Sequence, residues 1–383
     1  MPDNVLYMRC GNRRASVCPS CSHEYEGDMW HLLSAGVTGG SKGVPDSVAE
    51  HPMVFATLTA PSFGPVHTAS TPSSRRRCHP RAPEHRCVHG VPTSCIRRHD
   101  TDQAVVGEPI CRDCYDYDGH IVWQWWAPKL WRCFTIAVRR LLASRLGMSE
   151  NKSRQFVRLQ FAKVAEYQRR DAIHFHALIR LDSAPIDGEP FQVPGAGFSA
   201  SLLAEVVKDA ARAVAFEAPA IQTGRELRVI RFGAQIDSRP VCRDSQSSDV
   251  SPRMVTAYLA KYATKSVDDL VGPEDSTRTS AHLTRLRLTA ETLGRLTDDE
   301  RYKHLKKWSR MLGFRGHFAT KSRSFSTTMG ALRQARRDYF RGDDHDDRRD
   351  SDESTLVVGD WRFIGMGWLT PADEILATAT SSP

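Results

Sequence analysis

Two histidines separated by one residue, His174 and His176, lie in the apolar stretch IHFHALIRLD. The alternation in this stretch predicts a β-strand, where side chains two positions apart point to the same face of a sheet. Both imidazoles would then face one divalent cation, with Ile173, Phe175 and Ala177 on the opposite, packing face. Taken alone, such a pair is more often structural than a metal site, so its meaning depends on what lies beside it.

A carboxylate in the preceding predicted strand, QFVRLQFAKVAEYQ, offers a third ligand. If Arg169-Arg170-Asp171 is a three-residue hairpin loop, Glu166 lies directly opposite His174 on the same face. Such a loop needs its third residue in the left-handed region, which Asp tolerates. A two-residue loop would instead place Glu166 opposite Phe175. Two imidazoles and one carboxylate would leave positions on a divalent cation open for phosphate oxygens and water.

A second group of reactive side chains lies in RMVTAYLAKYATKS at 253–266, which predicts a helix. Offsets of three and four residues share a helical face. They therefore predict one stripe of phenols and ammonium groups, made of Tyr258, Lys261, Tyr262 and Lys265. Phenols beside cations suit nucleophilic attack on a phosphodiester. The alternative is an amphipathic surface helix with half-buried tyrosines.

Cysteine usage predicts structural zinc. The chain has ten cysteines. Two C-x-x-C pairs have the spacing of ligands that share a tetrahedral ion. Residues 68–120 lack the apolar periodicity of a core and need a staple such as zinc. The predicted ligands are Cys10, Cys18, Cys21, Cys78, Cys87, Cys95, Cys111 and Cys114, with His89 or His99 able to replace a cysteine. Their pairing stays open, free core thiols are the alternative, and Cys133 and Cys242 are predicted to be ordinary thiols.

The chain is basic, with 53 Lys and Arg against 45 Asp and Glu. Residues 301–341 carry twelve Lys and Arg and one acidic residue, Asp338, which makes this stretch +11. Such a block is typical of a nucleic-acid contact surface, and the alternative is a solvated helical face. The candidates for phosphate contacts are Arg315, Lys321, Arg323, Arg333, Arg336 and Arg337.

The elements that position these residues predict an α+β protein with a central antiparallel sheet. FATLT at 55–59 predicts an inner strand, and helices are predicted after Pro128 within 121–145 and over 199–217, the latter capped by Ser199 or Ser201. No run of about 18 apolar residues or secretory signal is present, so a cytoplasmic protein without membrane contact is predicted. No phosphate-loop motif indicates a motor.

FATLT, the HFH hairpin and YLAKYATK follow one another along the chain. Their residues and their order resemble the three motifs of the HUH endonucleases that start rolling-circle replication. The paired tyrosines resemble the two-tyrosine branch of that superfamily. More closely, CGNRRASVCPSC, CRDCYDYDGH, KVAEYQRRDAIHFHALIRLD and MLGFRGHFATKSRSFSTTMGALRQARRDY resemble actinobacterial plasmid and integrative-element initiators of the RepSA type. Asp171 departs from the glycine usual in that hairpin turn.

The resemblance implies a sheet of HUH endonuclease type and a catalytic Mg²⁺ or Mn²⁺ held by His174 and His176. One tyrosine would attack single-stranded or extruded origin DNA, leaving a 5′-phosphotyrosine and a 3′-hydroxyl that primes synthesis. The second tyrosine would act at termination, and Tyr258 and Tyr262 are not ranked by spacing. A host helicase and DNA polymerase are the implied partners.

These observations predict four regions along the chain. They are an N-terminal Cys-rich zinc-binding segment at 1–50, a HUH endonuclease domain at 51–270 with a Cys/His-rich insertion at 68–120, a basic helical DNA-binding region at 281–341, and a charged linker and C-terminal tail at 342–383. The alternatives in function are a conjugative relaxase or transposase of the same superfamily, and a non-catalytic zinc-dependent regulator that binds nucleic acid.

Overall fold

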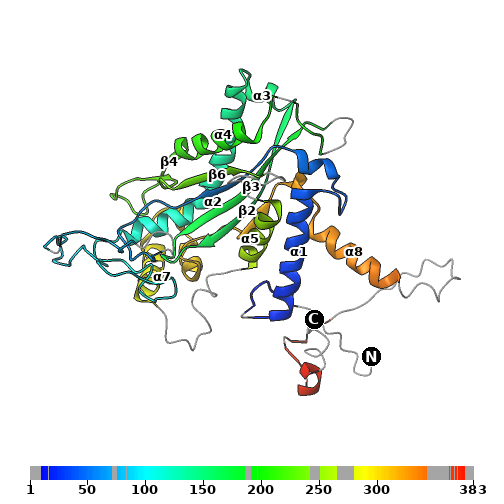
Figure 1. Cartoon of the computed structure of the whole chain (residues 1–383). Helices are drawn as coiled ribbons and strands as arrows, with labels where there is room; N and C mark the ends of the chain where they lie inside the picture. Colours follow the sequence, from blue (N-terminus) through cyan, green and yellow to red (C-terminus); the bar gives the residue numbers. More distant parts are fainter. Residues whose placement is uncertain are drawn as a thin grey trace.

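The structure, a computed structural model, describes most of the chain (Figure 1). The described residues are 10–15, 17–70, 76–82, 84–185, 191–195, 197–241, 251–264 and 280–342, with short pieces between 362 and 375. The predictions made for Lys265, for Cys242 and for most of the 342–383 tail lie outside these residues. Among the described helices, none combines the length and apolar character that a transmembrane span requires.

A five-stranded antiparallel sheet lies at the centre of the molecule and confirms the predicted α+β class. Its order is β6-β1-β3-β2-β7. The bounds are Met53–Leu58 for β1, Val157–Tyr167 for β2, Ile173–Ser183 for β3, Ile236–Pro240 for β6 and Ala319–Lys321 for β7. The predicted FATLT strand is β1, which pairs with β3 on one side and β6 on the other. A separate two-stranded sheet joins β4 (Ala215–Ala218) to β5 (Arg228–Arg231).

Helices cover both faces of the large sheet. One layer contains α2 (Tyr117–Arg145), α4 (Ala200–Ala213) and α7 (Ala281–Leu296), and the other contains α1 (Pro19–Thr38) and α5 (Pro252–Thr264). Phe175, Ala177 and Ile179 of β3 pack into the first layer, while Leu178 packs into the second. This alternation is the one that the sequence predicted, and it places the two histidines of β3 on the α5 side.

The basic region at 281–341 shares the core of the sheet. Strand β7 pairs with β2, with Val164 opposite Ala319. Helix α7 buries Leu283 and Leu286 in the same core as α2. Beyond β7, α8 (Met329–Gly342) follows a short 3₁₀ turn, η4 (Arg323–Phe325). Further 3₁₀ turns span Asp46–Glu50, Glu300–Tyr302 and Leu305–Met311, and a short helix, α3, spans Glu150–Ser153.

Helix α2 begins earlier than the sequence predicted. It starts at Tyr117 with Asp116 as its N-cap, whose side chain accepts from the N–H of Gly119, and Pro128 lies inside it. The prediction that the helix starts after Pro128 was wrong because burial outweighs the loss of one backbone hydrogen bond. The indole N–H groups of Trp123, Trp125 and Trp126 all donate to acceptors on other elements. In α4 the predicted N-cap is resolved to Ser199, whose hydroxyl accepts from Leu202.

A buried ion pair joins β3 to the first helix. Arg180 is fully buried and makes two bonds to Asp182, Nε to Oδ1 at 2.7 Å and Nη2 to Oδ2 at 2.9 Å. Its Nη1 donates to the carbonyl of Gly36 in α1. His51 Nδ1 lies 2.7 Å from Asp182 Oδ1. This network connects the sheet to α1 and to the segment before β1.

Replacing Arg180 with Met is expected to lower the free energy of unfolding by about 3–5 kcal/mol, because it leaves the Asp182 carboxylate buried without its cation. Urea denaturation followed by circular dichroism measures this. The double variant Arg180→Met/Asp182→Leu should regain much of the loss. A single variant as stable as the parent would show that the pair does not hold α1.

Candidate active site

The predicted metal ligands converge on one point. The register of β2 and β3 places Glu166 opposite His174, which confirms the three-residue loop. Glu166 Oε2 lies 3.0 Å from His174 Nε2 and 3.1 Å from His176 Nε2. The two Nε2 atoms are 3.0 Å apart. A carboxylate oxygen and two imidazole nitrogens therefore form a compact set of three donors.

The hairpin turn that sets this register is anchored by α2. Asp171 adopts a φ of 60°, the left-handed conformation that the loop requires. Its carbonyl accepts from the side chain of Gln124, and Gln124 Oε1 accepts from the N–H of Ile173. Arg170 donates to the backbone carbonyls of Ala60 and Pro61. These contacts stabilise Asp171 in a conformation for which related proteins usually have Gly.

Strand β1 orients the second histidine. Thr57 lies opposite His176, and its Oγ1 is 3.1 Å from Nδ1 of that ring. The ring of Phe55 stacks on His176 with centroids 5.8 Å apart. A partner at Nδ1 favours the tautomer that leaves Nε2 free for a metal. The sequence marked FATLT only as a strand and missed this role of Thr57.

Helix α5 brings both tyrosines to the ligands. The Tyr258 hydroxyl lies 3.1 Å from Nε2 of His176. The Tyr262 ring packs against Tyr258 with centroids 4.4 Å apart and lies 6.1 Å from the His176 ring. Lys261 lies on the exposed side of the helix. The structure therefore brings Tyr258 closest to the histidines, an order that spacing alone left open.

The protonation states suit metal binding. Burial opposes ionisation of Glu166, but hydrogen bonds from His174 and His176 lower its pKa to about 2. Burial lowers the pKa of His176. Burial and the charge of Glu166 raise the pKa of Tyr258. An ionised carboxylate and a neutral imidazole are the forms that bind metals, whereas the phenol is held protonated.

The spacing of the three donors fits an octahedral ion. Metal–ligand distances of about 2.1 Å at right angles place neighbouring ligands about 3.0 Å apart. The spacings among Glu166, His174 and His176 are 3.0–3.1 Å. Three ligands on one side also leave three positions open, so the residues fit Mg²⁺ or Mn²⁺.

Replacing Thr57 with Val is expected to weaken Mn²⁺ binding about 10–100-fold, because the His176 ring loses its partner at Nδ1. Calorimetric titration with Mn²⁺ measures the affinity. Thr59→Val is the matched control, since the Thr59 hydroxyl donates to the carbonyl of Gln235 and not to a ligand. Equal affinities in the two variants would contradict the role of Thr57.

Most of the predicted DNA-binding side chains have partners within the protein. Arg336 pairs with Glu24 and Asp28 of α1, so it docks α8 on that helix. Lys321 donates to three backbone carbonyls around η4. Arg315 lies over the ring of Trp125 at 4.4 Å. Arg333 lies 4.0 Å from Asp28, and Arg337 donates to Gln334. Binding to DNA stays a prediction for all six side chains, Arg323 included.

The eight predicted zinc cysteines gather into clusters, two of which include histidines. The ligand atoms within each cluster lie within 4.8 Å of one another. The clusters are Cys10, Cys18 and Cys21; His67, Cys78, Cys95 and His99; and Cys87, His89, Cys111 and Cys114. His89 and His99 were both considered from the sequence. His67 was missed because it stands outside the Cys-rich segment.

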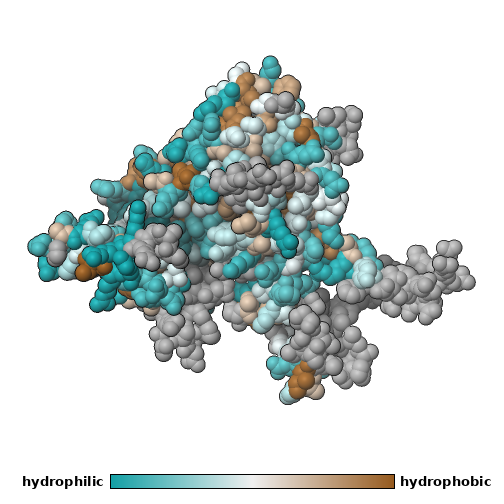
Figure 2. Space-filling model, in the orientation of Figure 1, coloured by the Kyte–Doolittle hydropathy of each residue, from teal (hydrophilic) through white to brown (hydrophobic). Residues whose placement is uncertain are grey.

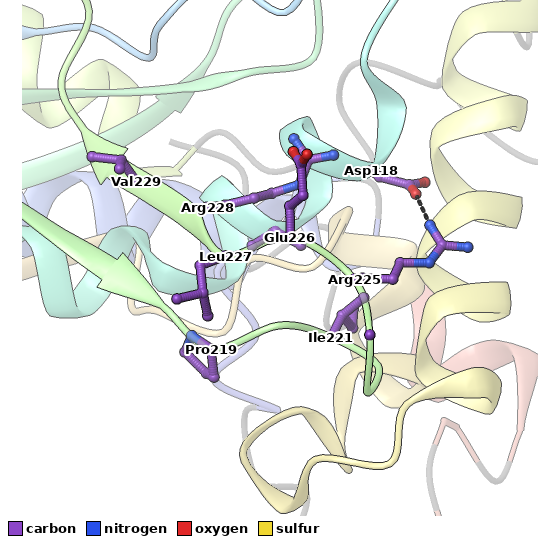
Figure 3. Close-up of a pocket in the computed structure, with 10 residues that line it drawn as sticks. Asp118, Pro219, Ile221, Arg225, Glu226, Leu227, Arg228 and Val229 are labelled. Atoms are coloured by element: carbon purple, nitrogen blue, oxygen red, sulfur yellow. Dashed lines mark hydrogen bonds and ion pairs between the residues drawn. The ribbon is translucent and has the colours of Figure 1, made fainter.

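A cavity of about 520 Å³ lies elsewhere, between the start of α2 and the β4–β5 hairpin (Figure 3). Both arginines at its wall are already paired, since Arg225 Nη1 donates to Asp118 Oδ2 at 3.0 Å and Arg228 Nη1 to Asp116 Oδ2 at 2.5 Å. No metal-ligand cluster contributes to its described lining. It is therefore not the candidate active site.

Comparison with known proteins gives one family and one curated relative. The model of the family described as RepSA, the replication initiator protein of pSAM2, matches residues 1–382. A replication initiator protein of Streptomyces ambofaciens is 39% identical over 393 residues, which cover 98% of this chain and 80% of that protein. No solved structure matches the chain significantly.

Proposed function

Because this chain belongs to the RepSA family of replication initiator proteins, we propose that it is an endonuclease that nicks one strand of a replication origin and so starts rolling-circle replication. The replicon would be a plasmid or an integrative element. The observation that carries the proposal is the placement of the Tyr258 hydroxyl 3.1 Å from Nε2 of His176, within a set of three metal donors.

The reaction is a transesterification. The Tyr258 oxygen forms a bond to the scissile phosphorus while the bond from phosphorus to the 3′ oxygen breaks. The phenol loses one proton and the leaving 3′ oxygen gains one, so no net proton or water is used. The products are a 5′-phosphotyrosine and a free 3′-hydroxyl that a polymerase extends.

The chain's own residues supply position and charge. Glu166, His174 and His176 would hold a Mg²⁺ or Mn²⁺ ion, which when bound polarises the scissile phosphate. Thr57 and Phe55 hold the His176 ring in place. Packing against His176 holds the Tyr258 ring beside the metal ligands. Because the phenol is already positioned, less entropy is lost when it attacks the phosphate.

A groove of about 610 Å³ lies beside the site. It is lined by parts of 59–69, 106–107, 168–170 and 233–235, together with His79. The amide of Gln168 at its edge lies 3.4 Å from His174 Nδ1. We propose that a single strand of DNA lies in this groove. The segment between β1 and α2, called the arm below, lies beside the groove. Its described residues include six exposed arginines suited to phosphate contacts, namely Arg76, Arg77, Arg81, Arg86, Arg97 and Arg98.

The experiment is incubation of the full chain with Mn²⁺ and an origin oligonucleotide labelled at the 3′ end, followed by denaturing electrophoresis. The expected result is a labelled protein adduct, because the 5′ phosphate of the downstream fragment becomes bound to the tyrosine. With a 5′ label, a short free strand should appear instead. Duplex binding without cleavage under any divalent cation would favour a non-catalytic regulator.

A further inference from the structure

The arm between β1 and α2 has no hydrophobic core. Among the described residues from Gly64 to Ile110, no Val, Ile, Leu, Met, Phe, Tyr or Trp side chain is buried. The chain there forms loops with a few isolated bridges, such as His79 with Cys95. Figure 1 shows it extending away from the sheet, and Figure 2 shows a mainly hydrophilic surface there. Another source of folding energy must hold it.

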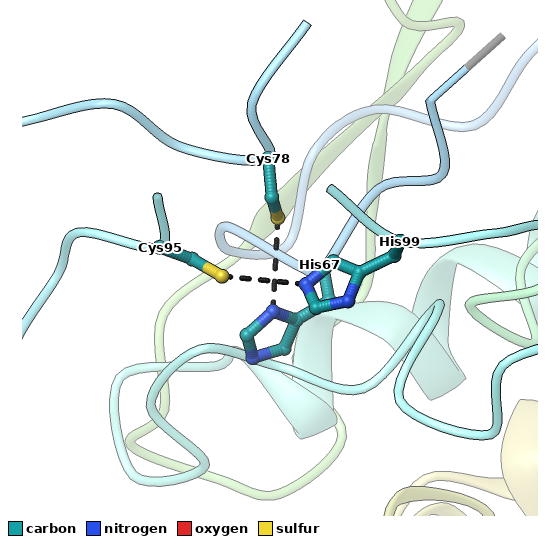
Figure 4. A group of neighbouring side chains, drawn as sticks. All are labelled: His67, Cys78, Cys95 and His99. Carbon is teal, nitrogen blue, oxygen red and sulfur yellow. Dashed lines mark hydrogen bonds between the residues drawn. The ribbon is translucent and has the colours of Figure 1, made fainter. Parts of the chain in front are cut away.

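The ligand atoms of His67, Cys78, Cys95 and His99 lie within 4.8 Å of one another, close enough to share one zinc ion (Figure 4). Zn–S and Zn–N bonds of about 2.3 and 2.1 Å place sulfur and nitrogen ligands about 3.6 Å apart. The Cys78 Sγ lies 3.6 Å from His67 Nδ1, and the Cys95 Sγ lies 3.3 Å from His99 Nε2. Two thiols and two imidazoles form a complete set of four ligands.

Neighbouring groups orient these ligands as they do in zinc sites. The other ring nitrogen of His99, Nδ1, lies 3.1 Å from Gln103 Oε1, which directs Nε2 toward the cluster. The backbone N–H of Thr68 donates to the Cys78 Sγ at 3.2 Å. His99 is only 4% exposed, although most residues around it in the arm are exposed or half-buried.

The cluster of Cys87, His89, Cys111 and Cys114 has three thiols and one imidazole. His89 Nδ1 lies 3.2 Å from the Cys114 Sγ and 3.8 Å from the Cys111 Sγ. Cys87 completes the set from the same tight turn as His89, closed by the bond from Gly90 N–H to the Cys87 carbonyl. This cluster fastens the tip of the arm to the turn that precedes α2.

We propose that the described residues between His67 and Cys114 form an interleaved two-zinc module. The first and third ligand pairs along the chain, His67/Cys78 and Cys95/His99, bind one Zn²⁺. The second and fourth pairs, Cys87/His89 and Cys111/Cys114, bind the other. Each ion therefore closes a loop that contains ligands of its neighbour, and each adds its own share of the folding energy that holds the arm. This inference does not rest on the proposed nicking chemistry.

The module shapes one wall of the groove described above. His67 and His79 line it, and Gly107 packs directly against the carbonyl of Arg169 in the hairpin turn. Gly107 has a φ of 96°, and a Cβ there would meet that carbonyl oxygen at 2.0 Å. The arm therefore contacts the turn that positions Glu166 and His174.

Zinc content of purified variants tests the pairing. Cys78→Ser and Cys87→Ser should each lose one Zn²⁺ per chain. The same-site double variant Cys78→Ser/Cys95→Ser should still lose one, whereas the cross-site double Cys78→Ser/Cys87→Ser should lose two. Cys133→Ser is the matched control and should lose none. A cross-site double that loses only one ion would overturn the interleaving in favour of sequential sites.

Alkylation of the unaltered protein keeps the inference testable if a variant fails to fold. N-ethylmaleimide should label Cys78, Cys87, Cys95, Cys111 and Cys114 at least ~10-fold faster after chelation than before. Mass spectrometry of peptides reads each position, and Cys133 should label at the same rate in both samples. Equal rates for the five cysteines with and without chelator would overturn the two-zinc module.

Discussion

Replacing Tyr258 with Phe is expected to lower the rate of origin nicking by at least ~10³-fold and to remove the covalent adduct. The ring that packs against His176, Phe55 and Tyr262 stays, so the helix should remain folded. Only the hydroxyl 3.1 Å from His176 is lost. Denaturing electrophoresis of a 3′-labelled origin strand with Mn²⁺ measures the effect.

Tyr262→Phe is expected to leave the first nick within a few-fold of the parent and to impair the second strand transfer. The Tyr262 ring lies farther from His176, so it suits a step that begins when Tyr258 already carries DNA. Tyr339→Phe, at an exposed position of α8, is the control and should cut and join normally. Adduct formed by the Tyr258→Phe/Tyr262→Phe protein would refute tyrosine catalysis at α5.

Replacing either metal-site histidine with Ala is expected to reduce nicking by about 10³-fold or more, since the divalent cation loses one of three protein ligands. Duplex binding should stay within a few-fold, because phosphate contacts elsewhere supply most of the affinity. Mn²⁺ titration should show weakened binding in His174→Ala and His176→Ala. His304→Ala, exposed and outside every described cluster, is the control.

The two effects are separable. Loss of the histidines should weaken both metal binding and nicking, whereas loss of Tyr258 should abolish nicking with Mn²⁺ affinity within a few-fold of the parent. A His174→Ala/His176→Ala protein that nicks at the parental rate would show that the metal site lies elsewhere. Parental metal affinity with lost nicking would mean that the histidines act on the DNA directly.

Part of the site could be predicted from local periodicity. Two-residue spacing along a strand determines that His174 and His176 share a face. The sequence allowed a hairpin loop of two or three residues, and only the register of β2 and β3 decided that Glu166 joins them. Helical spacing likewise determines that Tyr258 and Tyr262 lie together. The shared face of the histidines and that of the tyrosines each depend on backbone geometry within one element, so the residue types and their spacing specify them.

The tertiary structure decided what depends on packing between distant elements. Which tyrosine meets His176 follows from how α5 lies on the sheet, a contact across 82 residues. The burial of three tryptophans extended α2 through Pro128, and ion pairs drew Arg336 to α1. The sequence did not show which cysteines and histidines share a cluster. Contacts in space, such as that between His67 and Cys78, decided it. No local period encodes such contacts, because they arise from the complementarity of surfaces that the chain brings together only when it folds.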